Sequence, residues 1–161
     1  LFKVKWYDIP QNRERVIFIG IRTDISSKIN FQWPEEKQVI TKNLKDAIGD
    51  LPLEYDVSIQ HIGTKHKVKI TGYIGNRKLE WDNISPTITG RGGGTGGPVI
   101  NIHPSATRRM TVREYARIQT FPDDFTFCGS ISSMYRQIGN AVPPKFSIVL
   151  VDIISKIEEQ L

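Results

Sequence analysis

A short apolar segment near the amino terminus has the pattern of a buried β-strand. The residues from Val16 to Ile21 are apolar or glycine and mostly β-branched, and polar or charged residues flank them at 11–15 and 22–24. A continuous apolar run of this kind is typical of a strand that is covered on both faces, as in an α/β sheet. A chain of 161 residues offers little to cover such a strand twice. The pattern therefore also indicates a missing partner.

The following segments have a weaker pattern. Residues 25–60 are irregular, and Thr41 is placed to cap a short helix that runs to Ile48. Residues 65–82 alternate between apolar and basic or polar positions, which predicts a curved, half-buried β element with a basic face. We expect Lys67, Lys69 and Thr71 on its basic face, Val68, Ile70 and Tyr73 on its apolar face, and a hairpin turn at Gly75–Asn76.

A well-delimited helix is predicted near residue 111. Thr111 and Glu114 have the spacing of a capping box, in which each residue bonds the other's backbone amide. Met110 and Tyr115 occupy the two positions of a hydrophobic staple. We expect this helix to end at Pro122, because proline cannot continue a helix.

Two further helices are expected after it. The first would begin at Ser132 or Ser133 and stop at Gly139–Asn140. The second would carry Pro143–Pro144 in its first turn and run to about Glu159. Its apolar face would consist of Phe146, Val149, Leu150, Ile153 and Ile157.

Composition and charge add modest constraints. Hydrophobic residues make up 39% of the chain and charged residues 24%, which is typical of globular rather than disordered proteins. The net charge of +5 favours a polyanionic partner, although charge alone is weak evidence. The single cysteine, Cys128, excludes an internal disulfide and favours a reducing, intracellular location. No secretory signal or apolar run of membrane-spanning length is visible in the sequence.

Metal binding and nucleophilic catalysis find little support in the residues. His61, His66 and His103 lack the spacing of a metal site and have no cysteine partner, so we expect no metal. Cys128 has no histidine arranged around it in sequence. We therefore expect it to contribute packing rather than nucleophilic attack.

Three other segments are candidates for chemistry. Arg13 and Arg15 lie two apart at the start of the predicted strand, so both side chains should point to the same side. Such a pair suits a phosphate or an electron-rich oxygen, although a solvated strand end is the simpler interpretation of these residues alone. The glycine-rich segment Arg91–Pro98 could bring backbone amides close to a ligand or form a plain surface loop. Gly139–Pro144 joins two helices by a tight turn, which could be purely structural or could present amides to a polar ligand.

The order of these segments resembles that in the DNA (cytosine-5) methyltransferases. Gln11–Arg15, followed by the apolar run, resembles the QxRxR motif, which is the family's motif VIII. Arg109–Phe125 resembles motif IX, and Tyr135–Pro144 resembles motif X. Pro86–Thr89 is similar to the threonine-hydrophobic pair that closes the family's target recognition region. Residues 25–84 match only in position and length.

The resemblance implies a reaction. Members of the family transfer a methyl group from S-adenosylmethionine to carbon 5 of a cytosine that has been flipped out of duplex DNA. Their nucleophile lies in a Pro-Cys loop, a supporting glutamate lies in a Glu-Asn-Val motif, and a glycine-rich loop holds the cofactor. None of these motifs occurs in this chain, and Cys128 follows Phe127 rather than a proline. We therefore expect the chain to be inactive alone.

The resemblance also implies roles for residues that are present. Arg15 matches the arginine that contacts oxygen 2 of the flipped cytosine, where negative charge develops. Arg13 matches its companion, which helps to hold the catalytic loop and the DNA backbone. The segment that closes over S-adenosylmethionine is matched by Asn140, Ala141 and Val142.

The best candidates for reading DNA sequence lie in one loop. Glycines would let this loop approach the major groove, where Arg91 could reach a guanine edge or a phosphate. The expected DNA-binding residues are Thr87, Ile88, Thr89, Arg91, Gly92, Gly93 and Gly94.

The expected fold is α+β. It would combine a β-rich target recognition lobe and helices with one strand and a carboxyl-terminal helix that belong to a Rossmann-like methyltransferase domain. An apolar surface along the 16–21 strand and the 146–157 helix face should be exposed where the catalytic half belongs. We expect four parts, namely the last part of the catalytic domain at 1–24, the target recognition domain at 25–108, the small-domain motifs IX and X at 109–142, and the returning helix at 143–161.

Three interpretations of the chain stay open. It is an excised carboxyl-terminal fragment of a methyltransferase, a natural small subunit of a split enzyme, or a free-standing, sequence-specific DNA-binding module. Leu1 in place of methionine and the uncovered strand favour the first. The expected partners are double-stranded DNA and the amino-terminal catalytic half, with no membrane. The expected location is the cytoplasm of a bacterial or phage-infected cell, in association with DNA.

Overall fold

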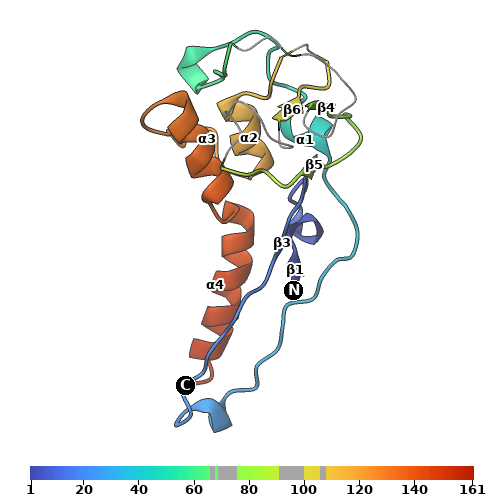
Figure 1. Ribbon diagram of the computed structural model, residues 1–161. Coiled ribbons are helices and arrows are strands. Elements are labelled where there is room, and N and C mark those ends of the chain that lie inside the picture. Colours follow the sequence, from blue (N-terminus) through green and yellow to red (C-terminus); the bar gives the residue numbers. More distant parts are fainter. Residues whose placement is uncertain (66–67, 69–75, 91–99, 106–107) are drawn as a thin grey trace.

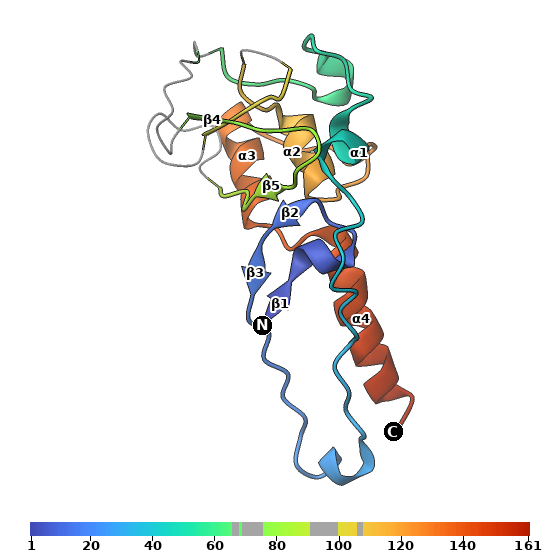
Figure 2. The ribbon, with the colours of Figure 1, turned by 90° about the vertical axis from the view of Figure 1, so that its right-hand side faces the viewer.

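The computed structural model describes the chain except for residues 66–67, 69–75, 91–99 and 106–107. Short strands and helices form a compact head above an elongated tail (Figures 1 and 2). We call the part with α1, α2, α3, β4, β5 and β6 the head, and residues 1–42 with α4 the tail. The elements are β1 (Phe2–Lys3), η1 (Val4–Tyr7), β2 (Gln11–Asn12), β3 (Glu14–Arg15), η2 (Ser26–Lys28), α1 (Leu44–Ile48), η3 (Val57–Ile59), β4 (Asn76–Lys78), β5 (Ser85–Pro86), β6 (Ile100–Ile102), α2 (Val112–Ile118), α3 (Ile131–Asn140) and α4 (Pro144–Glu158).

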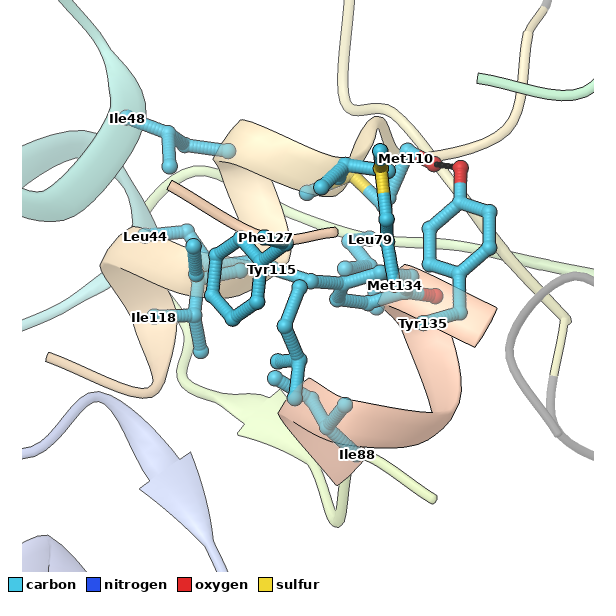
Figure 3. Close-up of a cluster of buried hydrophobic side chains, with 13 residues drawn as sticks. Leu44, Ile48, Leu79, Ile88, Met110, Tyr115, Ile118, Phe127, Met134 and Tyr135 are labelled. Atoms are coloured by element: carbon cyan, nitrogen blue, oxygen red, sulfur yellow. Dashed lines mark hydrogen bonds between the residues drawn. The ribbon is translucent and has the colours of Figure 1, made fainter. Parts of the chain in front are cut away.

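The head is organised around one hydrophobic cluster between its three helices (Figure 3). Tyr115 of α2 and Tyr135 of α3 meet edge to face, with ring centroids 5.7 Å apart. The Tyr135 hydroxyl donates a hydrogen bond of 2.7 Å to the carbonyl oxygen of Met110, so its polar atom is satisfied inside the cluster. Full burial of each large side chain contributes about 1.5–3 kcal/mol. The fully or nearly fully buried members include Leu44, Ile48, Leu79, Ile88, Val112, Ile118, Phe127 and Ile138.

Side-chain caps define where the helices of the head begin. The predicted capping box of α2 is confirmed, since the Glu114 amide donates to Thr111 Oγ1 at 3.2 Å and the Thr111 amide donates to the Glu114 carboxylate at 2.7 Å. The predicted cap of α1 was wrong, because Asn43 forms its capping box while the Thr41 hydroxyl donates to Asp8. A cap must lie directly before the first helical turn, and Asn43 occupies that position.

The other helix ends differ from the prediction by a few residues. α3 begins at Ile131, and its cap is Ser130, whose side chain accepts from the Ser133 amide, rather than Ser132 or Ser133. α2 ends at Ile118, several residues before Pro122, because Thr120 adopts a left-handed backbone with φ of 67°. α4 runs from Pro144 to Glu158, as predicted.

The tail contains a second, smaller hydrophobic cluster. Phe2, Val4 and Ile9 pack with Phe146 of α4. Val149 and Leu150 of α4 are partly buried against this cluster, and Ile153 is buried on the same helix. The amino-terminal segment therefore covers the α4 face that we expected to be exposed. The exposed apolar side chains of α4 are instead Ile148, Val151 and Ile154.

The predicted strand at Val16–Ile21 is absent from the structure. β3 ends at Arg15, which pairs with Phe2 of the antiparallel β1, and the apolar run that follows has no neighbouring strand. Phe18 is 91% exposed. Backbone amides and carbonyls form a strand only against a partner, and the described part of the chain does not supply one. The apolar surface that we expected here is present, although the strand is not.

The described residues form three two-stranded sheets and no β-rich lobe. β1 pairs with β3, β2 pairs in parallel with β5, and β4 pairs in parallel with β6. Asn76 begins β4, and the predicted hairpin turn at Gly75–Asn76 depends on residues that lie outside the described ones. Most of the predicted basic β element, namely Lys67, Lys69, Ile70, Thr71, Tyr73 and Gly75, lies outside the described residues. The fold is a mixture of helices and strands, which agrees with the expected α+β class.

One apolar stretch of the chain spans α3 and α4. A window within Ile131–Glu158 is long and apolar enough to resemble a membrane span, whereas no such run was expected from the sequence. The stretch consists of two helices, α3 and α4, separated by a turn at 141–143. Length and composition alone are weak evidence for a membrane helix.

Candidate functional site

The site is built where the QxRxR segment lies beside residues 85–88. β2 and β5 run parallel, with Gln11 opposite Ser85 and Asn12 opposite Pro86. The Ser85 amide donates to the carbonyl oxygen of Pro10 at 2.8 Å, and the Thr87 hydroxyl donates to that of Asn12 at 2.6 Å. Segments that are more than 70 residues apart in sequence are thereby held in one register.

Two side chains of the motif hold the backbone of Ile88. Gln11 Oε1 accepts from the Ile88 amide at 2.9 Å, and Arg13 Nη1 donates to the Ile88 carbonyl oxygen at 2.9 Å. Residues two apart in extended chain point to the same side, so the spacing of the motif explains how both reach one residue. The alternation that predicted a shared side for the arginines applies to Gln11 as well.

Arg13 also connects this segment to the end of α3. The same Nη1 donates to the carbonyl oxygen of Gly139 at 3.1 Å. The side chain is buried, and burial, followed by repulsion from Arg15, lowers the pKa of Arg13 to about 10. The guanidinium is therefore still a cation at neutral pH, and it places positive charge beneath the surface of the site.

Arg15 has a different environment. It is exposed, and its Nη1 donates to the carbonyl oxygen of Glu14 at 2.6 Å. A hollow of about 400 Å³ lies between the two arginines and the end of α3. The residues that line the hollow are Arg13, Arg15, Thr87, Ile88, Thr89, Gly90, Gly139 and Asn140.

The hollow brings together six of the residues that were predicted from sequence, namely Arg13, Arg15, Thr87, Ile88, Thr89 and Asn140. Ala141 and Val142 follow directly in the turn between α3 and α4, where Val142 is exposed. The Thr89 hydroxyl is buried without a hydrogen-bond partner within the described part of the chain. Arg91, Gly92, Gly93 and Gly94 lie outside the described residues, so the structure does not place them.

A glycine allows α3 to approach the segment at residues 89–90. A β-carbon at Gly139 would overlap the backbone carbonyl of Thr89 and the amide of Gly90. On the other side of this contact, a β-carbon at Gly90 would lie 2.7 Å from Asn140 Oδ1. The two glycines thus permit the contact that forms one wall of the hollow.

Two glutamines were not singled out from the sequence. Gln11 Nε2 donates to Gln119 Oε1 at 2.6 Å, and Gln119 Nε2 donates to the carbonyl oxygen of Ile138 at 2.7 Å. Both side chains are fully buried. Each glutamine lies inside one of the motif-like segments, and this was the signal in the sequence that could have identified it. Hydrophobic periodicity did not predict that either side chain would be buried.

A second polar cluster is buried away from the hollow. Arg108 donates to the Glu114 carboxylate at 2.7 and 3.0 Å, and His103 Nε2 lies 3.5 Å from it. Thr111 Oγ1 lies 3.0 Å from His61 Nδ1. Burial lowers the pKa of His61 and of His103, and the negative charge of Glu114 opposes this only in part. The cluster stabilises the start of α2 and contains no group that lines the hollow.

The hollow is suited to an electron-rich oxygen. The two guanidiniums supply positive charge and planar donors, and Asn140 adds an exposed amide. Cys128 does not line the hollow. Within the described ranges, no group of histidine, cysteine or carboxylate side chains could hold a metal ion. The site can therefore bind and orient a ligand, and no cysteine lies among its described lining residues.

Comparisons with known proteins agree on one family. The model of the family described as C-5 cytosine-specific DNA methylase matches residues 1–159. The Type II methyltransferase M.Eco47II of Escherichia coli is 34% identical over 200 residues, which cover 99% of this chain and 46% of that protein. M.PspPI of Psychrobacter sp. (strain TA137) is 33% identical over 187 residues, covering 93% of this chain and 43% of that protein.

A solved structure is also similar. It is a putative DNA modification methyltransferase encoded within a prophage (E. coli), with 27% identity and a TM-score of 0.46 over 66% of this chain and 28% of that one. The chain spans about half the length of the curated relatives described above. The family match extends over nearly all of its residues, and so the chain belongs to the C-5 cytosine-specific DNA methylases.

Proposed function

We propose that this chain is the DNA-recognition and cofactor-closing carboxyl-terminal portion of a DNA (cytosine-5) methyltransferase. The complete enzyme would transfer a methyl group from S-adenosylmethionine to carbon 5 of a cytosine flipped out of duplex DNA. The observation that carries the proposal is the hollow at which Arg13, Arg15, Thr87–Thr89 and Asn140 meet.

The two arginines would have different tasks. Arg15 is exposed at the hollow and free to donate to oxygen 2 of a flipped cytosine. A donor at that atom stabilises the negative charge that develops when the ring is attacked. Arg13 already uses Nη1 on the Ile88 and Gly139 carbonyls. Its task would be to hold the two walls of the hollow together and to add positive charge.

The turn at Asn140, Ala141 and Val142 would form one wall of the cofactor site. Asn140 and Val142 are both exposed, which leaves an amide and an apolar side chain available to a ligand that has both polar and apolar parts. These residues fit a partial site, since the chain has no glycine-rich cofactor loop. When bound, S-adenosylmethionine would supply the methyl group. The turn would contribute only binding and closure.

DNA contacts would extend from the hollow along the following loop. Thr87–Thr89 lie at the hollow and lead directly to Arg91 and the glycines Gly92, Gly93 and Gly94. We propose that this loop reaches the duplex, with Arg91 at a base edge or a phosphate. The net charge of +5 supports a polyanionic partner without identifying it.

The catalytic half is proposed as the partner that covers the exposed apolar surface. We define this surface by Val16, Phe18, Ile148, Val151 and Ile154, all of which are exposed. The curated relatives are about twice as long as this chain, so a catalytic half of similar size is available to cover the surface. In that assembly Val16–Ile21 would gain strand neighbours and enter a Rossmann-like sheet.

This proposal keeps the division of the chain that was expected from sequence. Residues 1–24 and 143–161 would belong to the catalytic domain, residues 25–108 to the target recognition domain, and residues 109–142 to the small domain. The packing of Phe2, Val4 and Ile9 on Phe146 is consistent with placing the two ends together. The assembled enzyme would act on DNA in the cytoplasm.

A complementation assay tests the proposal. Transfer of labelled methyl groups from S-adenosylmethionine to mixed-sequence duplex DNA is measured with this chain alone, with the catalytic half alone, and with both. We expect activity only in the mixture, because the nucleophile and the DNA-reading residues lie on different halves. Activity of this chain alone would contradict the assignment. Sequence-specific duplex binding by this chain, with no activity in any mixture, would favour a DNA-binding module instead.

A further inference from the structure

We infer that the buried amide bridge, defined as Gln11 and Gln119, is a positioning element that couples occupation of the DNA-facing segment to occupation of the cofactor-facing turn. The DNA-facing segment is Thr87–Thr89, and the cofactor-facing turn is Asn140–Val142. The inference rests on the proposed function of the hollow. It adds a role for two side chains that do not line the hollow and so do not contact either ligand there.

The bridge begins at the DNA-facing segment. Gln11 Oε1 accepts from the Ile88 amide at 2.9 Å, in the middle of Thr87–Thr89. Gln11 Nε2 donates to Gln119 Oε1 at 2.6 Å. One side chain therefore uses its acceptor on the DNA-facing segment and its donor on the next member of the bridge. Any shift of the Ile88 backbone acts on the Gln11 amide.

The bridge ends at the cofactor-facing turn. Gln119 Nε2 donates to the carbonyl oxygen of Ile138 at 2.7 Å, just before the turn. The next residue holds the far side, because Thr120 Oγ1 accepts from the Lys145 amide at 3.1 Å in the first turn of α4. Thr120 adopts φ of 67°, which is unusual for a β-branched residue. Two successive residues thus hold the chain before and after Asn140–Val142.

Because the bridge is buried, a movement at one of its ends is transmitted to the other end. Gln11 and Gln119 are fully buried, so water is not available to replace a broken hydrogen bond. A movement at Ile88 must then either carry the turn with it or leave a buried amide unpaired. Ligand binding that orders one end will favour the bound position of the other end. Coupled sites of this kind typically change each other's affinity by about 5- to 150-fold.

Arg13 forms a parallel link, since it bonds the carbonyls of both Ile88 and Gly139. It also lines the hollow, so its substitution would remove a ligand contact together with the link. The glutamines do not have this ambiguity. They are therefore the residues at which coupling can be separated from binding.

The test measures coupling in the assembled enzyme, which is this chain together with the catalytic half. The dissociation constant of S-adenosylhomocysteine, an unreactive product, is measured with and without a duplex that the enzyme methylates. In the parent enzyme we expect the duplex to tighten this binding by about 5- to 150-fold. Gln119→Met keeps the side-chain volume but loses the hydrogen bonds with Gln11, Ile138 and Ala141. In this variant we expect the ratio to fall toward one.

A matched control separates coupling from a general loss of stability. Gln60 makes the same two kinds of hydrogen bond elsewhere in the head, with the Phe127 carbonyl at 2.8 Å and the Phe127 amide at 2.9 Å. Gln60→Met should destabilise the head while the coupling ratio stays at the parent value. An equal loss of coupling in Gln60→Met and Gln119→Met would overturn the inference.

A conservative variant gives a second measurement, which can be used even if Gln119→Met folds poorly. In Gln119→Glu, the protonated carboxyl can accept from Gln11 and donate to Ile138 as the amide does, whereas the carboxylate cannot donate. Burial favours the protonated form. We expect the coupling ratio of Gln119→Glu, relative to the parent at each pH, to recover as the pH falls from about 8 to about 6. A ratio that stays below the parent value by the same factor at both ends of this pH range would overturn the inference.

The two proposals fail in different ways. If the parent assembly neither binds the duplex nor transfers methyl groups, the proposed function fails. If the parent assembly is active and shows coupling, but Gln119→Met retains the full ratio, only the role of the amide bridge fails.

Discussion

At the scale of single residues, two arginines of the same motif have opposite environments. Arg13 is buried and donates to two backbone carbonyls, whereas Arg15 is exposed at the hollow. The alternation of extended chain points both toward the same side, and burial differs because residues 88 and 139 cover only the first. One arginine therefore maintains the site, and the other is available to a ligand.

Substitution should separate these two roles. Arg13→Ala leaves the Ile88 and Gly139 carbonyls without their donor, so we expect a loss of about 1–3 kcal/mol in the free energy of unfolding. Arg15→Ala should change that free energy by less than about 0.5 kcal/mol. In the assembled enzyme, however, it should lower kcat by about 10²- to 10³-fold. Urea unfolding of the chain and methyl-transfer rates of the assembly measure the two effects, and similar stability losses in both variants would contradict the assignment.

The buried histidines predict a pH dependence of stability. Burial lowers the pKa of His61 and of His103 below the usual value of 6.5, so the folded chain holds both neutral. As the pH falls through 6.5, the unfolded chain takes up protons that the folded chain does not. Stability should therefore be fully present above pH 6.5 and decline below it.

The slope of the free energy of unfolding against pH should reach at most about 1.4 kcal/mol per pH unit for each histidine. Urea unfolding between roughly pH 7.5 and 5.5 measures it, a window above the titration of Asp8, Asp56 and Asp123, whose pKa values are lowered. His103→Gln should remove part of the slope. A slope that is unchanged in this variant would show that His103 is not held neutral by the fold.

At the scale of elements, the critical contact is between α3 and the segment at residues 89–90. Gly139 allows the helix to touch the backbone of Thr89 and Gly90, and the Ile138 and Gly139 carbonyls receive the donors of Gln119 and Arg13. No other residue type fits at position 139, because a β-carbon would overlap backbone atoms that cannot rotate away. The end of α3 is thus placed by contact rather than by helix propensity.

Gly139→Ala should open this contact. We expect a loss of about 1–3 kcal/mol in the free energy of unfolding, the usual effect of overpacking, even though alanine favours helix. Gly20→Ala is the matched control, because a β-carbon there meets nothing within 4 Å and should be neutral or slightly stabilising. Thermal or urea unfolding of both variants provides the comparison. Gly139→Ala as stable as the parent would show that the contact is looser than described.

At the scale of the whole molecule, the head is closed and the tail is not. The head has a cluster shared by three helices (Figure 3), whereas the tail leaves Phe18, Ile148, Val151 and Ile154 exposed. The tail is also extended (Figure 2), and residues 30–35 line a hollow together with residues of α4. The Asn30 amide donates to Gln160 Oε1 at 2.6 Å, just after the end of that helix. An apolar surface of this kind is typical of an interface.

Polar substitutions on that surface should weaken association without unfolding the chain. Phe18→Ser combined with Ile154→Ser should change the free energy of unfolding by less than about 1 kcal/mol, because both side chains are exposed. The same pair should lower the affinity for the catalytic half at least about tenfold, the equivalent of one or two lost apolar contacts. Ile153→Ser, at a buried position of the same helix, should instead destabilise the chain. Unchanged affinity in the double variant would place the interface elsewhere.

The sequence by itself determined the features that depend on near neighbours. The capping box of Thr111 and Glu114 and the bounds of α4 follow from residues within a few positions of each other. The common side of Arg13 and Arg15 follows from the two-residue repeat of extended chain. The order of the motif-like segments also indicated the family, which the match over residues 1–159 shows.

Only the tertiary structure decided which of those features meet and which remain uncovered. Val16–Ile21 has the composition of a strand but no partner, so hydrogen bonding rather than propensity determined its conformation. The exposed face of α4 was assigned to the wrong side, because Phe2, Val4 and Ile9 cover the face that periodicity identified. The link from Gln11 to Gln119 joins residues 108 positions apart. Contacts over such separations depend on packing between elements, and no local pattern in the sequence encodes them.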